Sequence, residues 1–327
     1  MDRNPLWPGI SAGIAAGALW GLVFLAPELA GAFSPLQLAA GRYLAFGVIA
    51  AVLLVPRWSR VRASMGPREW RALVGLSLTG NIVYYVLLAS AVQLGGIAMT
   101  SLVIGFLPVA VTVLGSRGAG AMPLRRLAWP LVLGIAGIVC VGWETLAGAA
   151  PAKPASALGF LCALGALASW TSYAIVNNRW LSRLPHVSEH DWNLLIGVVT
   201  GALSLLLVVP AFLGRQASHA APAWGLFVAV CCGIALLSSV LGNAFWNRAS
   251  RRLPLTLVGS MILFETLFAL LYAFAWERRG PTGYESVAML LISGAVLASV
   301  WVHRHPAQHA TQALHPQADG HGPAAGP

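Results

Sequence analysis

Ten long apolar stretches run through the sequence, and they restrict it to a membrane protein. Lipid offers the backbone no hydrogen-bond partner, so a stretch of about 20 apolar residues is expected to cross the bilayer as a helix. Only 9% of the residues are charged, whereas a soluble domain carries about 25%. The approximate limits of the stretches are 7–26, 36–55, 70–92, 96–116, 127–147, 157–178, 191–213, 223–247, 254–275 and 283–302.

The positive charges predict the orientation of the chain. Fifteen of the 20 Lys and Arg residues fall on the side of the N-terminus and four on the opposite side, while Arg42 lies within a stretch. Because positive loops are retained in the cytoplasm, both termini are predicted to be cytoplasmic. Two termini on one side require an even number of crossings, which agrees with ten. This bias explains the net charge of +10 without nucleic acid as a partner, and it predicts a multi-pass protein of a bacterial inner membrane.

An internal repeat divides the chain into two halves. Trp20 in the first stretch matches Trp170 in the sixth, and the third and fourth stretches align with the eighth and ninth at an offset of 158 residues. An offset of 162 also pairs polar residues, but 158 aligns the helix ends. Because each half has an odd number of helices, the second half must enter the membrane from the opposite side. The prediction is an all-α integral membrane protein of ten transmembrane helices in two inverted five-helix repeats, residues 1–150 and 151–302, with a disordered cytoplasmic tail, 303–327.

This order of parts resembles the ten-helix EamA-type branch of the drug/metabolite transporter superfamily. The resemblance covers residues 7–302, and within the family it is strongest to the YddG group of aromatic amino-acid exporters. It implies a transporter with a binding site between the halves, and export rather than uptake rests on it alone. Neither half carries the whole Leu-Glu-Pro-like signature of the family. The matching residues are Trp20, Trp170, Arg42, the glycine-rich third helix, Phe106-Leu107-Pro108 and Phe264-Glu265-Thr266.

Polar and aromatic side chains at mid-depth are the candidates for substrate binding. Amides, phenols and indole N–H groups are unfavourable toward lipid, so they are expected to face the bundle interior. There they would line a cavity that suits a neutral or zwitterionic solute with an aromatic or apolar side chain, or else form an ordinary interhelical hydrogen-bond network. Asn81, Tyr84 and Tyr85 are predicted to share one helix face, whereas Trp246, near Arg248, is interpreted as an interfacial ring. The candidates are Trp20, Asn81, Tyr84, Tyr85, Trp170, Tyr173 and Asn243.

Two charged residues lie within the stretches. Glu265 is central in the ninth stretch, where a carboxyl group must be paired, solvated or protonated. It is the only mid-membrane acid available to carry a proton, and a structural, hydrogen-bonded glutamate is the alternative. Arg42, early in the second stretch, would bind a substrate carboxylate, pair with a helix end or extend to the membrane interface. We favour the interface for Arg42.

Proline and glycine mark two further features. Pro108 interrupts the backbone hydrogen bonds of the fourth helix, which predicts either a hinge or a fixed bend. Gly9, Gly13, Gly17 and Gly21 repeat every four residues, so they form a smooth stripe that allows another helix backbone to come close. Static packing is favoured for this stripe over a sliding surface.

Together these features predict a secondary transporter that exports aromatic or other apolar amino acids, or similar small metabolites, by alternating access. No Gly-x4-Gly-Lys sequence is present, so ATP is not the expected energy source. An exporter of organic cations is the first alternative, because Glu265 with aromatic neighbours would suit a cation. A membrane-embedded enzyme is less favoured, since no His or Asp lies at mid-depth. We expect no cofactor or metal, and the lipid bilayer and a small molecule as partners.

Overall fold

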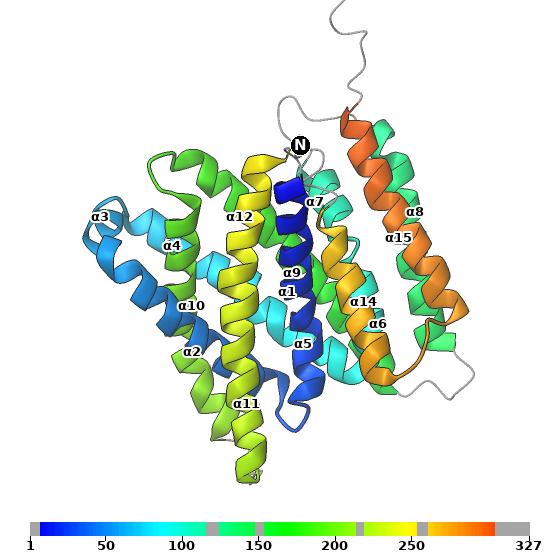
Figure 1. Ribbon diagram of the computed structural model, residues 1–327, viewed down its shortest axis with the longest axis horizontal. Helices are drawn as coiled ribbons and strands as arrows, with labels where there is room; N and C mark the ends of the chain where they lie inside the picture. The colour runs from blue at the N-terminus through cyan, green and yellow to red at the C-terminus, as the bar shows by residue number, and fades with distance from the viewer. Residues whose placement is uncertain (1–6, 116–123, 148–153, 214–218, 254–260, 305–327) are drawn as a thin grey trace, which may run out of the picture.

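The protein is a helical bundle throughout the part of the chain that the computed structural model describes, residues 7–115, 124–147, 154–213, 219–253 and 261–304. Within these ranges no strand occurs, and the all-α prediction is confirmed. The first residues of α1 and the last residues of α15 lie at the same end of the bundle (Figure 1). The predicted boundary at residue 150 and the tail beyond Arg304 lie outside the described residues.

Each predicted stretch coincides with one helix or with a short series of helices. The single helices are α1 (Trp7–Leu29), α2 (Pro35–Leu54), α8 (Leu124–Ala147), α9 (Pro154–Arg183), α10 (Glu189–Phe212) and α15 (Gly283–Arg304). Two short segments, η1 (Val55–Arg57) and α3 (Trp58–Ala63), follow α2. The series are α4 (Pro67–Ser77), η2 (Leu78–Val83) and α5 (Tyr84–Gly95); α6 (Ile97–Ile104) and α7 (Leu107–Gly115); and α11 (Ala221–Ile234), η3 (Ala235–Gly242) and α12 (Asn243–Arg252). The ninth stretch contributes α14 (Leu263–Glu277).

The outer surface of the bundle is apolar, as lipid requires. Leu206 and Leu290 expose 71% and 76% of their surface, and large apolar side chains are exposed on most of the long helices. Within the described residues, seven helical segments are long and apolar enough to cross a membrane, and two shorter apolar segments accompany them, Ile97–Val111 and Gly283–Ala298. The count of ten crossings, their inverted arrangement and the cytoplasmic side of the termini stay predictions.

The first helix of each predicted half packs against helices of the other half. α1 lies along η3, α12 and α14, whereas α9 lies along η2, α5, α6 and α7. The glycine stripe of α1 makes the first of these contacts. A Cβ placed on Gly17 or on Gly21 would lie 2.9 Å from the backbone nitrogen of Glu265 or Ala269, respectively. The stripe therefore brings two backbones together, as its spacing predicted.

Among the described helices, α2 and α10 have the most extensive contact. A Cβ placed on Gly47 would lie 2.5 Å from the Cα of Gly201, and one on Gly201 would lie 2.6 Å from the Cα of Gly47. α2 itself begins at a capping box, in which the Ser34 hydroxyl accepts from the Gln37 amide and the Gln37 side chain accepts from the Ser34 amide. The cap fixes where α2 begins, and the two glycines fix how closely it meets α10.

A polar turn joins α14 to α15. The Arg279 guanidinium donates to both carboxylate oxygens of Glu285, at 2.6 and 2.7 Å, and Glu285 also accepts from the Thr282 amide at 2.7 Å. The hydrogen bonds to Glu285 raise the pKa of Arg279 above its ordinary value. Arg278 immediately after α14 has a φ of 52°, in the left-handed region that favours glycine.

Replacing each of the two adjacent arginines in this turn with glycine is expected to shift the thermal midpoint in opposite directions. Arg278→Gly should raise the thermal midpoint of the purified protein slightly, because glycine relieves a strain of about 1 kcal/mol at the left-handed position. Arg279→Gly should lower it, because the substitution removes the bidentate ion pair with Glu285. Thermal unfolding in detergent, followed by size-exclusion chromatography, measures both. Equal shifts for the two variants would contradict this account of the turn.

Candidate functional site

Two segments inside the bundle depart from α-helical geometry. η2 and η3 are π-helical, and such wide turns are frequent at functional sites because they release backbone carbonyls from their usual partners. In η2 two backbone carbonyls accept hydrogen bonds from other helices. The Thr79 carbonyl accepts from the Ser169 hydroxyl of α9 at 2.7 Å, and the Asn81 carbonyl accepts from the Tyr43 hydroxyl of α2 at 3.0 Å. No sequence pattern had indicated either π-helical segment.

The fourth stretch is also interrupted, and its break meets the start of α14. α6 ends at Ile104 and α7 begins at Leu107, so Gly105 and Phe106 form a break. Pro108 is the second residue of α7, where the missing N–H is tolerated. Its role as a hinge stays a prediction. Residue 262 is a turn just before α14. A Cβ on Gly105 would lie 3.0 Å from the Thr266 hydroxyl, so the break between α6 and α7 lies against the first turn of α14.

Glu265 lies beside this meeting point. It is in the first turn of α14, where the positive end of the helix dipole favours a negative charge. Within the described part of the chain, no hydrogen bond or ion pair holds its carboxylate. The structural alternative, a hydrogen-bonded glutamate, therefore has no partner among the described side chains.

One aromatic group connects α5 with α9. The rings of Tyr84 and Trp170 have centroids 6.5 Å apart, and those of Trp170 and Tyr173 are 5.6 Å apart. Tyr173 lies directly against Gly80 of η2, where a Cβ would overlap the edge of its ring. The ring of Tyr173 therefore fits against η2 only because Gly80 has no side chain.

A second aromatic group connects α1 with α12. The rings of Trp20 and Trp246 have centroids 5.2 Å apart, and Trp20 Nε1 would lie 2.7 Å from a Cβ on Gly242. Trp246 was interpreted as an interfacial ring, but it packs on Trp20 instead. The side-chain amide of Asn243 donates to the backbone carbonyl of Ser239, one turn earlier in the same series of helices, at 2.9 Å. Both groups therefore place a ring from α1 or α9 against a glycine of a π-helical segment.

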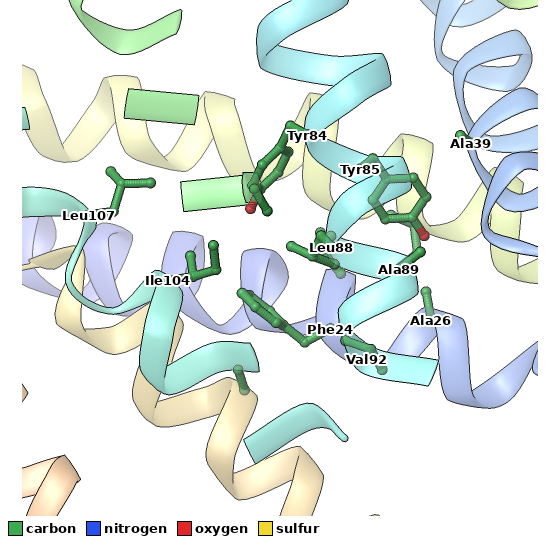
Figure 2. Packing of buried hydrophobic residues seen from close by; sticks show 14 of the residues in the cluster. Phe24, Ala26, Ala39, Tyr84, Tyr85, Leu88, Ala89, Val92, Ile104 and Leu107 are labelled. Carbon is green, nitrogen blue, oxygen red and sulfur yellow. The ribbon is translucent and has the colours of Figure 1, made fainter. Parts of the chain in front are cut away.

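The prediction that Asn81, Tyr84 and Tyr85 share one face is wrong. Asn81 donates to the Thr200 hydroxyl of α10 at 3.0 Å. Tyr84 faces Trp170 of α9, whereas Tyr85 packs edge-on against Tyr43 of α2. The two tyrosines point to different sides of α5 in Figure 2. Tyr84 is the residue that departs from the predicted face, because Asn81 and Tyr85 both contact Tyr43 of α2 whereas Tyr84 turns to α9.

Arg42 does not extend to the membrane interface, so the interpretation favoured from the sequence is wrong. The residue is only 7% exposed. Its guanidinium carbon lies 4.3 Å from the centre of the Tyr85 ring and 5.1 Å from that of Tyr43. The two tyrosine rings hold the cation inside the bundle by cation–π attraction. Tyr84 immediately precedes Tyr85 in the chain and faces Trp170, so the Arg42 cation lies close to the aromatic group of α5 and α9.

Apolar side chains pack together between α1 and α5, toward the ends of these two helices. Phe24 of α1 lies beside Leu88 and Val92 of α5 (Figure 2). Beyond them, the Gln93 side chain donates to the carbonyls of Pro27 and Phe33, at 3.3 and 2.9 Å. The side-chain amide therefore ties the end of α5 to the turn between α1 and α2.

Comparisons with known proteins agree with this geometry. Residues 7–143 match the EamA-like transporter family. The chain is 33% identical over 307 residues to the inner membrane protein YtfF of Escherichia coli (strain K12), covering 89% of this chain and 94% of that protein. A solved crystal structure has a TM-score of 0.60 at 20% identity, with 90% of this chain and 98% of that chain covered. At that identity the likeness concerns the fold alone.

These matches and the apolar helical bundle define a multi-pass membrane transporter. The chain belongs to the EamA-like transporter family. The predictions of that family and of a multi-pass inner-membrane protein are confirmed.

Proposed function

We propose that the protein is a secondary transporter that exports aromatic or other apolar amino acids, or similar small metabolites, by alternating access. The contact between the break at Gly105 and Thr266, in the first turn of α14, carries the proposal. Interrupted helices in corresponding positions of two halves are typical of transporter binding sites, because their free ends and released backbone groups face the solute.

The proposed inverted repeat has support in the irregular segments. The π-helical segments begin at Leu78 and Ala235, and the interruptions fall at Gly105 and Ile262. Both pairs are separated by nearly the 158 residues that the sequence alignment favours. In this arrangement, residues 1–150 and 151–302 form the halves, and the solute lies between them. The apolar contact at Phe24 and Leu88 is then one of two gates that open in turn.

The lining indicates the substrate. Trp20, Tyr84, Trp170 and Tyr173 offer flat apolar surfaces, on which an aromatic or branched side chain is stabilised by burial and ring contacts. The resemblance to the YddG group of aromatic amino-acid exporters supports the same class and the outward direction.

The experiment is counterflow in proteoliposomes. Vesicles are preloaded with unlabelled Phe, Trp, Thr or Met, and uptake of the labelled amino acid is measured against empty liposomes. We expect uptake by the wild type and at least a tenfold loss in Trp20→Ala and Tyr84→Ala, with Trp129→Ala as the control because that ring is exposed on the outer surface. If the folded protein takes up none of the four amino acids, the amino-acid proposal is rejected.

Glu265→Gln tests proton coupling in the same vesicles. If Glu265 carries a proton, the response of wild-type transport to a pH gradient should vanish in Glu265→Gln, because glutamine neither binds nor releases a proton. Counterflow without a gradient should persist. The control is Glu144→Gln, near the end of α8. A pH response that survives in Glu265→Gln would assign the glutamate a role other than proton transfer.

An exporter of organic cations is the second candidate, because Glu265 lies without an ion-pair partner among the described residues. A carboxylate beside aromatic rings is suited to a cationic solute. Uptake of labelled tetraphenylphosphonium without uptake of any amino acid would favour this function.

A further inference from the structure

Arg42 carries a buried charge that no acidic side chain of the described chain balances. More than nine-tenths of its surface is buried, and its Nε and Nη1 atoms have no hydrogen-bond partner among the described residues. Buried guanidinium groups are normally paired with a carboxylate or with several acceptors, because an unpaired charge is strongly unfavourable in an apolar interior.

The neighbours of Arg42 stabilise the face of its guanidinium, and the Tyr85 side chain also forms a hydrogen bond with it, but its Nε and Nη1 donors stay unused. Tyr43 and Tyr85 lie near enough for their rings to attract the cation. The Tyr43 hydroxyl is occupied with the Asn81 carbonyl, and the Cys231 thiol is directed at the Leu38 carbonyl. A guanidinium held in this way presents the N–H donors of Nε and Nη1 in its plane, and a carboxylate oxygen can accept a charge-assisted hydrogen bond from either of them.

Arg42 also belongs to the proposed transport region. α2 packs against α5 and α11, and Arg42 lies on the ring of Tyr85, the residue next to Tyr84, whose own ring faces Trp170. A group bound at Arg42 is thus close to the aromatic rings that are proposed to hold the apolar part of the solute.

We propose that Arg42 binds the carboxylate of the transported solute, so that the substrate is a carboxylic acid or amino acid and not an organic cation. This inference rests on the proposed transport function for the location of the site, and it adds the chemical group that the substrate must carry. It also gives Arg42 its missing partner, because the solute carboxylate supplies the acceptors that the protein does not.

Direct binding to the purified wild-type protein tests the inference without relying on transport. The probes share a phenyl ring: L-phenylalanine, 3-phenylpropionate, L-phenylalaninamide and phenethylamine. Binding is measured by isothermal titration calorimetry in detergent. We expect the two carboxylates to bind about 10- to 100-fold more tightly than the two compounds that lack a carboxylate, as the loss of charge-assisted hydrogen bonds predicts.

Substitutions at Arg42 assign this preference to the guanidinium. Arg42→Gln should remove the preference for carboxylates, and Arg42→Lys should keep part of it, because lysine retains the charge but not the paired donors. Arg62→Gln, at an exposed position, is the control and should bind as the wild type does. Size-exclusion chromatography establishes that each variant is folded. If Arg42→Gln does not fold, the partial loss in Arg42→Lys and the ligand series on the wild type decide the question.

Three results overturn the inference: equal binding of compounds with and without a carboxylate, unchanged carboxylate binding in folded Arg42→Gln, and no carboxylate binding by the folded wild type. The proposed function fails separately. Arg42-dependent binding of 3-phenylpropionate without counterflow of any amino acid would reject amino-acid export while supporting the carboxylate site.

Discussion

Gly47→Val is expected to prevent α2 and α10 from packing and to leave little folded protein. The reason is the contact between the two backbones, where even a Cβ would lie 2.5 Å from the Cα of Gly201. Neither backbone can yield as a side chain can, so the helices must separate along their length. We expect a loss of about 3 kcal/mol or more, which corresponds to a fall of roughly 5 °C or more in the thermal midpoint.

Gly233→Val is the matched control for this experiment. It places the same side chain in another long apolar helix, but nothing lies within 4 Å of the added Cβ. Fluorescence-detected size-exclusion chromatography after heating measures both variants. If Gly47→Val and Gly233→Val unfold at the same temperature, α2 and α10 are not in backbone contact and the arrangement of the bundle is wrong.

Gly80→Ala is expected to leave a folded protein that transports at least tenfold more slowly than the wild type. An added Cβ overlaps the ring of Tyr173, so the ring must leave its place beside Trp170. Relieving such a clash costs about 1–3 kcal/mol, and 1.4 kcal/mol is a factor of about ten in rate. Counterflow of the amino acid that the wild type takes up is the measurement.

Gly75→Ala is the control, because it lies five residues earlier in the same stretch and its Cβ meets nothing within 4 Å. Transport by this variant should equal that of the wild type. The double variant Gly80→Ala/Tyr173→Ala removes the overlap, so it should recover the stability lost in Gly80→Ala but not the transport. Full transport in Gly80→Ala would show that the position of Tyr173 does not matter for the solute.

The helices were predictable because each depends on its own composition. A stretch of apolar residues has no alternative to a helix in lipid, so α1, α2 and α10 agree with the predicted limits to within a few residues. The glycine stripe of α1 was likewise readable, since a spacing of four residues places small residues on one helix face. The packing partners of the stripe could not be predicted, because Leu253, which lies against Gly9, and Ala269, which lies against Gly21, are far away in the chain.

The candidate site was harder to predict, because the environment of a side chain depends on other helices. Arg42 near a helix end is ordinarily an interfacial residue, and only the rings of Tyr43 and Tyr85 hold it inside. Asn81, Tyr84 and Tyr85 were placed on one face, but Tyr84 turns to Trp170 while the other two contact Tyr43, at the end of the π-helical segment η2. Periodicity in a sequence carries no mark of such a segment, because the residues that form it have ordinary helix-forming side chains.

The packing of α1 also has a consequence for synthesis. α1 is the first helix made, but its glycine face fits η3, α12 and α14, and the Tyr272 hydroxyl binds the Ala18 carbonyl across 254 residues of chain. At a translation rate of about 5–20 residues per second, the first helix waits roughly 10 to 50 s for its partner. During that interval its smooth face is open to lipid or to the insertion machinery. A chain truncated before α14 therefore leaves α1 with an unoccupied packing surface, which quality-control proteases of the membrane can recognise.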